Sequence, residues 1–586
     1  MGEDTTAQMA RAAADSGRQL DVLGVRLGAL HIGVLLGVLL VLQVAGRKWW
    51  RYRGHVWRMK RLGKPTPAWN PFLGNMIAAA KMVNALPPKA HSTYIVNGVG
   101  KTIKHNGAFY LDLWPMTEPL LVVTDPDMAT QATTHPITGA RKPAVLKAWF
   151  LPITGGPSLF DSNDAAWKYL HNLFTPGFSA NNIANEVPVI ASKISVYRDL
   201  LRHRAREGGR FEMEPMTLSL IIDIIGEVVL NVSLDTQHAR HPLADAMIRQ
   251  LALKFSNYAP QKMMERLSPL YLYGNWRNSR DLDSHIRAQV ESRFRSYRAA
   301  EATGRAERYR SVMDLAIEDY MSQPGKRGAA ALDAEFMTMA VRNMRMFFFA
   351  GYDSSAATIV FCYHNIYRHP EVLARIRAEH DAVFGTGLGD DGRDDVPAQI
   401  ERDPALLNAL PYTLAVIKET MRLFPPAQGI REGSRELELV DAQGQKYPTE
   451  GISVLISHYG THRNPRAWVR PHDFLPERWL VAPGHELYPP RGAWRPFEQG
   501  PRLCVGQQLV FTEVKAVLAC VVREFDVRDC YAEIDAERGR PAAAALDLSG
   551  VDGDRAYMVE AGAAHPVGSY PCRVSFSGYG GRSKEG

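Results

Sequence analysis

The chain has few cysteines, and the ones it has form no pattern. Five cysteines are spread over 586 residues, with no C-x-x-C pair and no regular spacing. A disulfide scaffold needs a dense, even set of cysteines, so the sequence argues against that class of protein. Scattered cysteines in a long chain indicate reduced thiols, and we expect the main domain to face a reducing compartment.

Acidic residues are absent from one stretch near the N-terminus. The formal net charge of the chain is +7, yet the stretch RKWWRYRGHVWRMKRLGK alone carries eight basic residues, so the rest of the chain is nearly neutral. Because the basicity is local, it does not indicate a nucleic-acid-binding protein. The eight residues are Arg47, Lys48, Arg51, Arg53, Arg58, Lys60, Arg61 and Lys64.

Charged residues are also missing from LGALHIGVLLGVLLVLQVAG, which directly precedes the basic stretch. An uncharged run of about 20 residues is long enough to span a bilayer. The basic residues and Trp49, Trp50 and Trp57 at one end fit a cytosolic helix end with interfacial aromatic residues. One alternative is a buried core helix. The other is a cleaved signal peptide, which the long apolar run and the polar residues before it disfavour.

The sequence therefore divides into four parts. Pro65, Pro67 and Pro71 make a stiff connector after the basic stretch. No internal repeat or long low-complexity tract interrupts the remainder, and we expect one large domain there. The predicted parts are an N-terminal tail (1–26), a transmembrane anchor (27–46), a basic and Pro-rich hinge (47–75) and a catalytic domain (76–586).

Long helical patterns dominate the predicted domain. One unusually long helix is expected over 333–369, a second over 407–426 and a third over 503–525, with prolines ending the first two. Short strand-like runs such as ISVLISH and AYMVEA lie between and after them. The sequence therefore predicts a mainly α protein with small β-sheets.

The loop RPFEQGPRLCVGQQL places a lone cysteine just before the third helix. As a thiolate, Cys504 would be a strong ligand for haem iron, and a helix N-terminus favours the anion. Gly500 and Gly506 would let the backbone turn and approach a macrocycle, Arg502 would pair with a propionate, and Phe497 would keep water from the sulfur. Taken alone, Cys504 would be better interpreted as an ordinary buried side chain.

The five positions together match F-x-x-G-x-R-x-C-x-G, and this loop resembles the haem-ligand signature of the cytochrome P450 family. The resemblance extends from about residue 65 to 575 and implies the cytochrome P450 fold after one transmembrane helix. It also implies a haem b cofactor with Cys504 as the metal ligand. Fold, cofactor and activity are expectations at this point.

A second motif, KETMR, supplies the family's E-x-x-R at Glu419 and Arg422. Residues three apart share one face of a helix. In the family this pair locks to a later arginine, here Arg478 in FLPERW, and the role is structural. Without the cysteine loop, an ordinary surface ion pair would be the better interpretation.

A third motif, AGYDSS, lies in the long helix and is similar to the family's oxygen-activation motif. The resemblance implies that Asp353 and Ser354 are the catalytic acid–alcohol pair that delivers protons. Ala350 and Gly351 would leave room for oxygen and substrate, and Phe347, one turn earlier, would line an apolar substrate pocket. The alternatives are a kinked helix with a solvated Asp, and core packing for the aromatic residues.

Three further residues are expected to bind the cofactor. The segment DAAWKYLHNLF resembles the family's W-x-x-x-R pattern, with Trp167 in place and His171 where the family usually has Arg or Lys. A histidine is uncharged for much of the time near neutral pH. Arg431 follows the E-x-x-R helix at a position where related enzymes often place a propionate partner.

The resemblance implies a haem-thiolate monooxygenase that uses O2 and a lipophilic small molecule. No G-x-G-x-x-G follows a strand, and no length remains for a flavin domain, so electrons should come from a separate NADPH–cytochrome P450 reductase. The anchor and hinge are usual for endoplasmic-reticulum members, and the segments NLFTPGFS and AHPVGSYPCRVSF resemble fungal members of secondary metabolism. Two alternatives stay open: an isomerase or dehydratase of the same fold that needs no oxygen, and a non-catalytic haem sensor.

Overall fold

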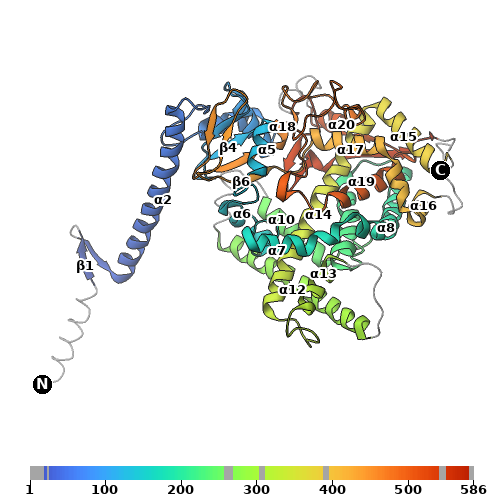
Figure 1. Cartoon of the computed structure of the whole chain (residues 1–586), viewed down its shortest axis with the longest axis horizontal. Helices are drawn as coiled ribbons and strands as arrows, with labels where there is room; N and C mark the ends of the chain where they lie inside the picture. Colours follow the sequence, from blue (N-terminus) through green and yellow to red (C-terminus); the bar gives the residue numbers. More distant parts are fainter. Residues whose placement is uncertain are drawn as a thin grey trace.

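The structure is a computed structural model that describes residues 19–22, 25–255, 268–302, 311–386, 395–539 and 550–579. Figure 1 shows a broad helical body from which one long helix projects. Most of the predicted N-terminal tail, and most of the Gly-rich loop after Gly385, lie outside the described residues.

Helices form most of the body, as the sequence predicts. They are α2 (Ala29–Arg61), α3 (Met76–Ala85), α4 (Ser92–Lys101), α5 (Pro126–Thr134), α6 (Ala144–Thr154), α7 (Asp164–Phe174), α8 (Ala180–Glu207), α9 (Met213–Ile225), α10 (Pro242–Phe255), α12 (Pro269–Ala302), α13 (Val312–Ser322), α14 (Ala334–Arg368), α15 (Pro370–Phe384), α16 (Val396–Arg402), α17 (Pro411–Leu423), α18 (His458–His462), α19 (Gln507–Val521) and α20 (Tyr531–Glu537). Short 3₁₀ turns include η1 (Thr175–Phe178), η4 (Pro476–Trp479) and η5 (Gly500–Arg502).

The strands form small separate sheets. They are β1 (Gln19–Val22), β2 (Val25–Gly28), β3 (Ala108–Leu111), β4 (Leu120–Val123), β5 (Phe211–Glu212), β6 (Gly429–Glu432), β7 (Glu438–Val440), β8 (Lys446–Pro448), β9 (Ser453–Ile456), β10 (Phe525–Asp529), β11 (Met558–Glu560), β12 (Ala564–Pro566) and β13 (Pro571–Phe576). The largest sheet has the order β3-β4-β9-β6, in which only β4 and β9 are parallel. The order β10-β13-β5 forms another sheet, and β11 pairs with β12 as a hairpin.

The long helix expected over 333–369 is present as α14. Asp333 caps its first turn by accepting a hydrogen bond from the Phe336 amide at 2.8 Å, and Pro370 begins the next helix. Most side chains of α14 are buried, and the helix packs along α9, α12, α17 and α19. The second and third expected helices are α17 and α19, so the three motifs lie on elements that meet in one core.

Helix α2 differs from the expected division into anchor and hinge. It begins at Ala29, two residues after the expected start, and continues without a break to Arg61, through the stretch predicted as hinge. Its last turns dock on the body: Val56 and Met59 are buried, and Arg53 pairs with the fully buried Asp112 at 2.5 Å. The basic stretch is therefore helical to Arg61, and only residues 62–75 form a non-helical connector.

The helix Gly33–Arg61 is long and apolar enough to cross a membrane, by length and composition, with a mean hydropathy of 1.3 in its apolar 18-residue window. No residue of its apolar window is buried. Figure 1 shows this part of α2 standing clear of the body. The alternative of a buried core helix is therefore excluded.

Candidate functional site

The cysteine loop lies between η5 and the first turn of α19. The Cys504 amide donates to the Phe497 carbonyl at 2.9 Å, which closes the loop. Gly500 has φ +75°, and a Cβ at this position would overlap the Thr133 carbonyl oxygen, so only glycine fits here. The loop therefore lies in close contact with α5, and this contact helps to hold the conformation of the loop.

Cys504 faces the N-terminus of α19. The Gly506 and Gln507 amides donate to its sulfur and lower the pKa of the thiol, but burial raises the pKa more, so the pKa lies above its ordinary value. The thiol lies deep in the protein, yet its surface is uncovered, which means that it faces an open internal space. The other four cysteines are buried in packed surroundings.

Two other predicted residues, Phe497 and Gly506, complete the loop. Phe497 packs edge-on against Trp494 and Phe511, with ring centroids 5.9 and 5.2 Å away. Gly506 has an ordinary φ of −82°, and a Cβ there would meet only the Cys504 sulfur at 3.8 Å. The chain turns at Val505 and Gly506 just before α19, and this φ does not by itself require glycine.

Arg502 bonds to the protein only through neutral groups. Its guanidinium donates to the carbonyl oxygens of Ala140, Leu159 and Ser162 and to the Asn163 side chain. It also lies 4.5 Å above the Trp167 ring. Burial is the main cause that lowers the pKa of Arg502 to about 9, with nearby Arg431 adding to the effect. The cation is thus held in place without a carboxylate bonded to it.

Arg431 lies on β6 and is fully buried. It donates to the Gly139 carbonyl at 2.7 Å and pairs with Glu498 of the cysteine loop. The other Glu498 oxygen bonds to His458 at 2.8 Å. Burial would raise the pKa of Glu498, but Arg431, His458 and Arg495 together hold it far below its ordinary value. Glu498 is therefore an ionised carboxylate inside the protein.

Buried positive charge exceeds buried negative charge in this region. Lys142 and Arg495 are also buried and interact electrostatically with Arg431 and Glu498. We call the residues Lys142, Arg431, Arg495 and Arg502 the cation cluster; within it, Glu498 is the one bonded carboxylate among the residues described. Buried charges need partners, so the cluster fits the two propionates of a haem.

The remaining predicted cofactor residues lie on α7 beside the cluster. The rings of Trp167 and His171 are 5.1 Å apart, and Trp167 lies under Arg502. Trp167 therefore lies next to both His171 and Arg502, and binding of a cofactor by these three residues stays a prediction. Sequence reasoning missed Glu498, Lys142 and Arg495, although charged residues inside an otherwise apolar loop are a signal that could have found two of them.

One face of α14 is uncovered at the predicted oxygen motif. Ala350 is exposed and Ser354 partly exposed, whereas Tyr352 and Asp353 between them are buried. The Ser354 hydroxyl donates to the Ala350 carbonyl one turn earlier at 2.8 Å. This uncovered face and the uncovered Cys504 thiol are the surfaces that a haem would cover. In the part of the chain that is described, no group of three or more His, Cys, Asp or Glu could hold a metal ion.

The structure gives Gly351 and Phe347 other neighbours than expected. A Cβ on Gly351 would overlap Ile225, so this glycine lets α9 approach α14. Phe347 is buried and packs against Phe174 and Phe178 at centroid distances of 5.0 and 5.3 Å. These contacts favour the core-packing alternative for Phe347. Contact of either residue with substrate stays a prediction.

Asp353 points away from the uncovered face, into a buried charged group. Its carboxylate accepts from the Ala563 amide at 2.5 Å and pairs with His565 at 3.1 Å. The other ring nitrogen of His565 lies 2.6 Å from Glu214. Sequence reasoning missed His565 and Glu214 because both are far from Asp353 along the chain. His565 lies more than 200 residues after Asp353, and Glu214 lies more than 100 residues before it.

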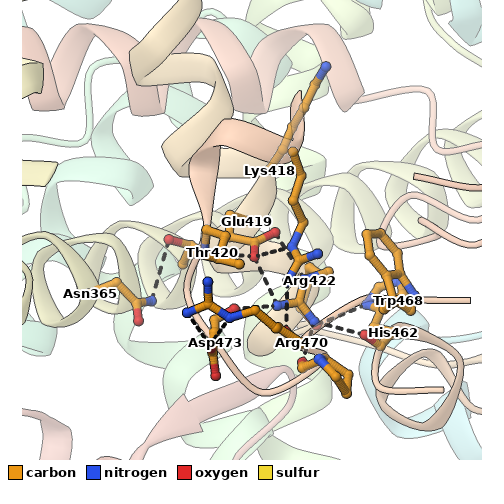
Figure 2. A network of polar contacts seen from close by, with 12 residues as sticks. Asn365, Lys418, Glu419, Thr420, Arg422, His462, Trp468, Arg470 and Asp473 are labelled. Atoms are coloured by element: carbon orange, nitrogen blue, oxygen red, sulfur yellow. Dashed lines mark hydrogen bonds and ion pairs between the residues drawn. The ribbon is translucent and has the colours of Figure 1, made fainter. Parts of the chain in front are cut away.

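Glu419, Arg422 and Arg478 meet as the motif predicts, and all three are essentially without solvent contact. Glu419 accepts two hydrogen bonds from Arg422 at 2.9 Å and one from Arg478 at 3.1 Å. Figure 2 shows Arg422 between this carboxylate and the segment that carries His462, Arg470 and Asp473. The group therefore ties α17 to the chain that leads into the cysteine loop.

The comparisons with known proteins agree with this geometry. Residues 65–537 match the family model described as Cytochrome P450. The chain is 36% identical over 535 residues to the cytochrome P450 monooxygenase polC of Polytolypa hystricis, covering 90% of this chain and 92% of that protein. It is 32% identical over 518 residues to the cytochrome P450 monooxygenase acrF of Aspergillus aculeatus, covering 85% and 99%.

A solved structure supports the same fold. The crystal structure of a cytochrome P450, CYP102L1, superimposes with a TM-score of 0.65 at 17% identity, covering 88% of this chain and 98% of that one. The chain therefore belongs to the cytochrome P450 family, and it is an enzyme of the monooxygenase class.

Proposed function

We propose that the protein is a membrane-anchored haem-thiolate monooxygenase that inserts one atom of O2 into a lipophilic small molecule. The observation that carries the proposal is the uncovered Cys504 thiol at the start of α19, next to the cation cluster. A haem bound there supplies the activation of oxygen, which no amino-acid side chain provides. Cys504 would hold the iron through its sulfur.

The cation cluster would hold the propionate side of the haem. Arg502 and Arg431 are fixed by backbone carbonyl groups, so their guanidinium groups do not need to reorganise when an anion binds. Trp167 and His171 would support this side from α7. Phe497 and its aromatic neighbours would keep water from the sulfur.

The N-terminal half of α2 supports the proposed membrane location, and the proposed redox partner depends on that location. We infer that its apolar part spans the endoplasmic-reticulum membrane once, with the body on the cytosolic side, because basic residues follow the apolar run. An NADPH–cytochrome P450 reductase in the same membrane would supply the electrons. The fungal relatives support a role in fungal secondary metabolism, and the anchor supports a lipophilic substrate.

The proposal is tested with the full chain in microsomes, with and without a fungal NADPH–cytochrome P450 reductase. We expect the reduced protein with carbon monoxide to show the red-shifted Soret band of a thiolate-ligated haem. NADPH-driven oxygen consumption should require the reductase. Haem binding without any oxygen consumption would favour the isomerase or dehydratase alternative, and the absence of haem from folded protein would overturn the proposal.

Replacing Ser354 with alanine is expected to keep haem binding but to divert electrons from product formation to hydrogen peroxide. The hydroxyl lies on the uncovered face of α14, where the proposal uses it to deliver protons. Without it, the hydrogen peroxide formed per NADPH should rise about tenfold, since a proton-transfer group contributes roughly 10²–10⁴-fold. Ser354→Thr keeps the hydroxyl and should restore coupling. Equal peroxide yields in Ser354→Ala and the unaltered protein would remove Ser354 from this role.

A further inference from the structure

A buried histidine lies between two buried carboxylates on the far side of the oxygen motif. His565 of β12 contacts Glu214 of α9 with one ring nitrogen at 2.6 Å and Asp353 of α14 with the other at 3.1 Å. The three residues are 3–5% exposed. Three separate elements thus place a carboxylate, an imidazole and a carboxylate in one hydrogen-bonded row, which we call the Glu214–His565–Asp353 row.

The hairpin of β11 and β12 holds this row in position. The Ala563 amide donates to the second oxygen of Asp353, and His565 is paired across the hairpin with Val559. Gly562 has φ +132°, and a Cβ there would lie against the Asp353 carboxylate. A side chain at Gly562 is thus excluded, and the hairpin tip closes over Asp353.

The charge state of the row follows from its neighbours. Burial by itself would lower the pKa of His565, but Glu214 and Asp353 raise it well above its ordinary value. His565 is therefore an imidazolium with an N–H aimed at each carboxylate. Other titratable groups lie near the row: Tyr352 interacts with Asp353, Tyr531 interacts with Glu214, and Lys89, Arg538, Arg555 and Tyr557 line the same cavity as Glu214 and His565.

The Glu214 end of the row opens to solvent. A surface cavity of about 400 Å³ is lined by Glu214 and His565 together with the exposed side chains of Lys89 and Arg538. Asp353 directly precedes Ser354 in the sequence, and Ser354 lies on the uncovered face of α14. The row therefore connects water at the surface with Asp353, the acid of the residue pair at which the proposed function needs protons.

We propose that the Glu214–His565–Asp353 row is a proton path that supplies Asp353 from the surface cavity. This inference rests on the proposed monooxygenase function and names two residues, Glu214 and His565, that act through Asp353. They are positioning and relay residues, since they touch neither haem nor substrate.

Each transfer in the path is balanced. When Asp353 passes a proton toward Ser354, the imidazolium gives its proton to Asp353 and becomes neutral. The neutral ring then rotates about both of its side-chain bonds until the bare Nε2 reaches Glu214. Glu214 has taken a proton from hydronium in the cavity, passes it to the ring and becomes a carboxylate again as the ring returns to its place. One proton has entered at Glu214 and one has left at Asp353, and the row has recovered its original charge. Two such cycles match the two protons consumed per O2 in a monooxygenase reaction.

The test compares His565→Gln and Glu214→Gln in the full chain with reductase, using oxygen alone as the probe. Both amides can hydrogen-bond in the row but cannot pass a proton. We expect NADPH-driven oxygen consumption to fall at least fivefold and its solvent deuterium isotope effect to rise, with the carbon monoxide spectrum unchanged. A fall in thermal stability alone, with unchanged rate and isotope effect, would show a purely structural row and overturn the proposal.

Matched controls use the same substitutions at other buried sites. His380 is a buried histidine bonded to Thr413, and Glu186 is a buried carboxyl on α8. His380→Gln and Glu186→Gln should leave both readouts unchanged. An equal loss of rate in these controls would attribute the effect to general destabilisation and overturn the proposal.

A second readout does not depend on haem or oxygen. In protein labelled with ¹⁵N-histidine, the ring signals that disappear in His565→Gln belong to His565. Both nitrogens are expected to be protonated at pH 7.5, and a neutral ring would overturn the path. If the unaltered protein bound no haem, the proposed function would be wrong, and the proton path would have no acceptor. If the unaltered protein bound haem normally and both variants kept its rate and isotope effect, only the proton path would be overturned.

Discussion

Replacing Cys504 with serine is expected to abolish the thiolate-type carbon monoxide spectrum and at least 99.9% of monooxygenase turnover, on the order of 10³-fold or more. A serine hydroxyl stays protonated near neutral pH and does not push electron density toward oxygen as a thiolate does. Because the Cys504 side chain is uncovered, the smaller oxygen atom leaves no cavity in the packed core. The protein should therefore still fold.

The control for this prediction is Cys530→Ser. Cys530 is buried beside the Arg528 carbonyl, which a hydroxyl can use as an acceptor. This variant should keep both the spectrum and the turnover. The measurements are the reduced carbon monoxide difference spectrum and far-ultraviolet circular dichroism of the same samples. An unchanged band in Cys504→Ser would mean that another group binds the iron.

Replacing Glu419 with glutamine is expected to destabilise the fold by about 3–5 kcal/mol. Glu419 accepts hydrogen bonds from Arg422, Arg478, the Leu475 amide and the Trp479 indole, all at 2.9–3.2 Å. Glutamine would leave two buried guanidinium groups without a counter-charge, and it would turn an NH2 group toward donors. Since total stability is of order 5–15 kcal/mol, we expect little folded protein.

Glu477→Gln is the matched control, since Glu477 lies in the same segment but is partly exposed. Its ion pair with Arg375 at 3.0 Å is on the surface and contributes less than about 1 kcal/mol. The measurements are the midpoint of thermal unfolding and the ratio of Soret to protein absorbance. If Glu419→Gln unfolded at the same temperature as Glu477→Gln, the buried group would not hold α17 to the segment before the cysteine loop.

The sequence predicts the fold well where its signals are local. Asp333 and Pro370 predict the two ends of the long helix to within one residue, because a capping side chain and a proline act on the adjacent backbone. The spacing of Glu419 and Arg422 predicts that they share a helix face, and they do. The prolines of FPP likewise end α17 at Leu423.

Predictions that depend on distant contacts were less complete. The basic stretch was interpreted as part of a hinge, because nothing near Arg53 in sequence announces Asp112 as its buried partner. Gly351 was interpreted as space for oxygen, whereas Ile225 of another helix fills that side. His565 and Glu214 were missed for the same reason, since no motif connects a C-terminal hairpin to the start of α9.

The docking of α2 has a mechanical consequence. From Gly46, the end of the apolar run, to the buried Arg53 the helix rises about 10 Å, at 1.5 Å per residue. That distance is comparable with the thickness of a head-group layer, at roughly 5–8 Å per side. With α2 in a bilayer, the body would be attached rigidly to the anchor rather than joined to it by a flexible linker. The tilt of one helix would then set the face that the enzyme presents to the lipid surface.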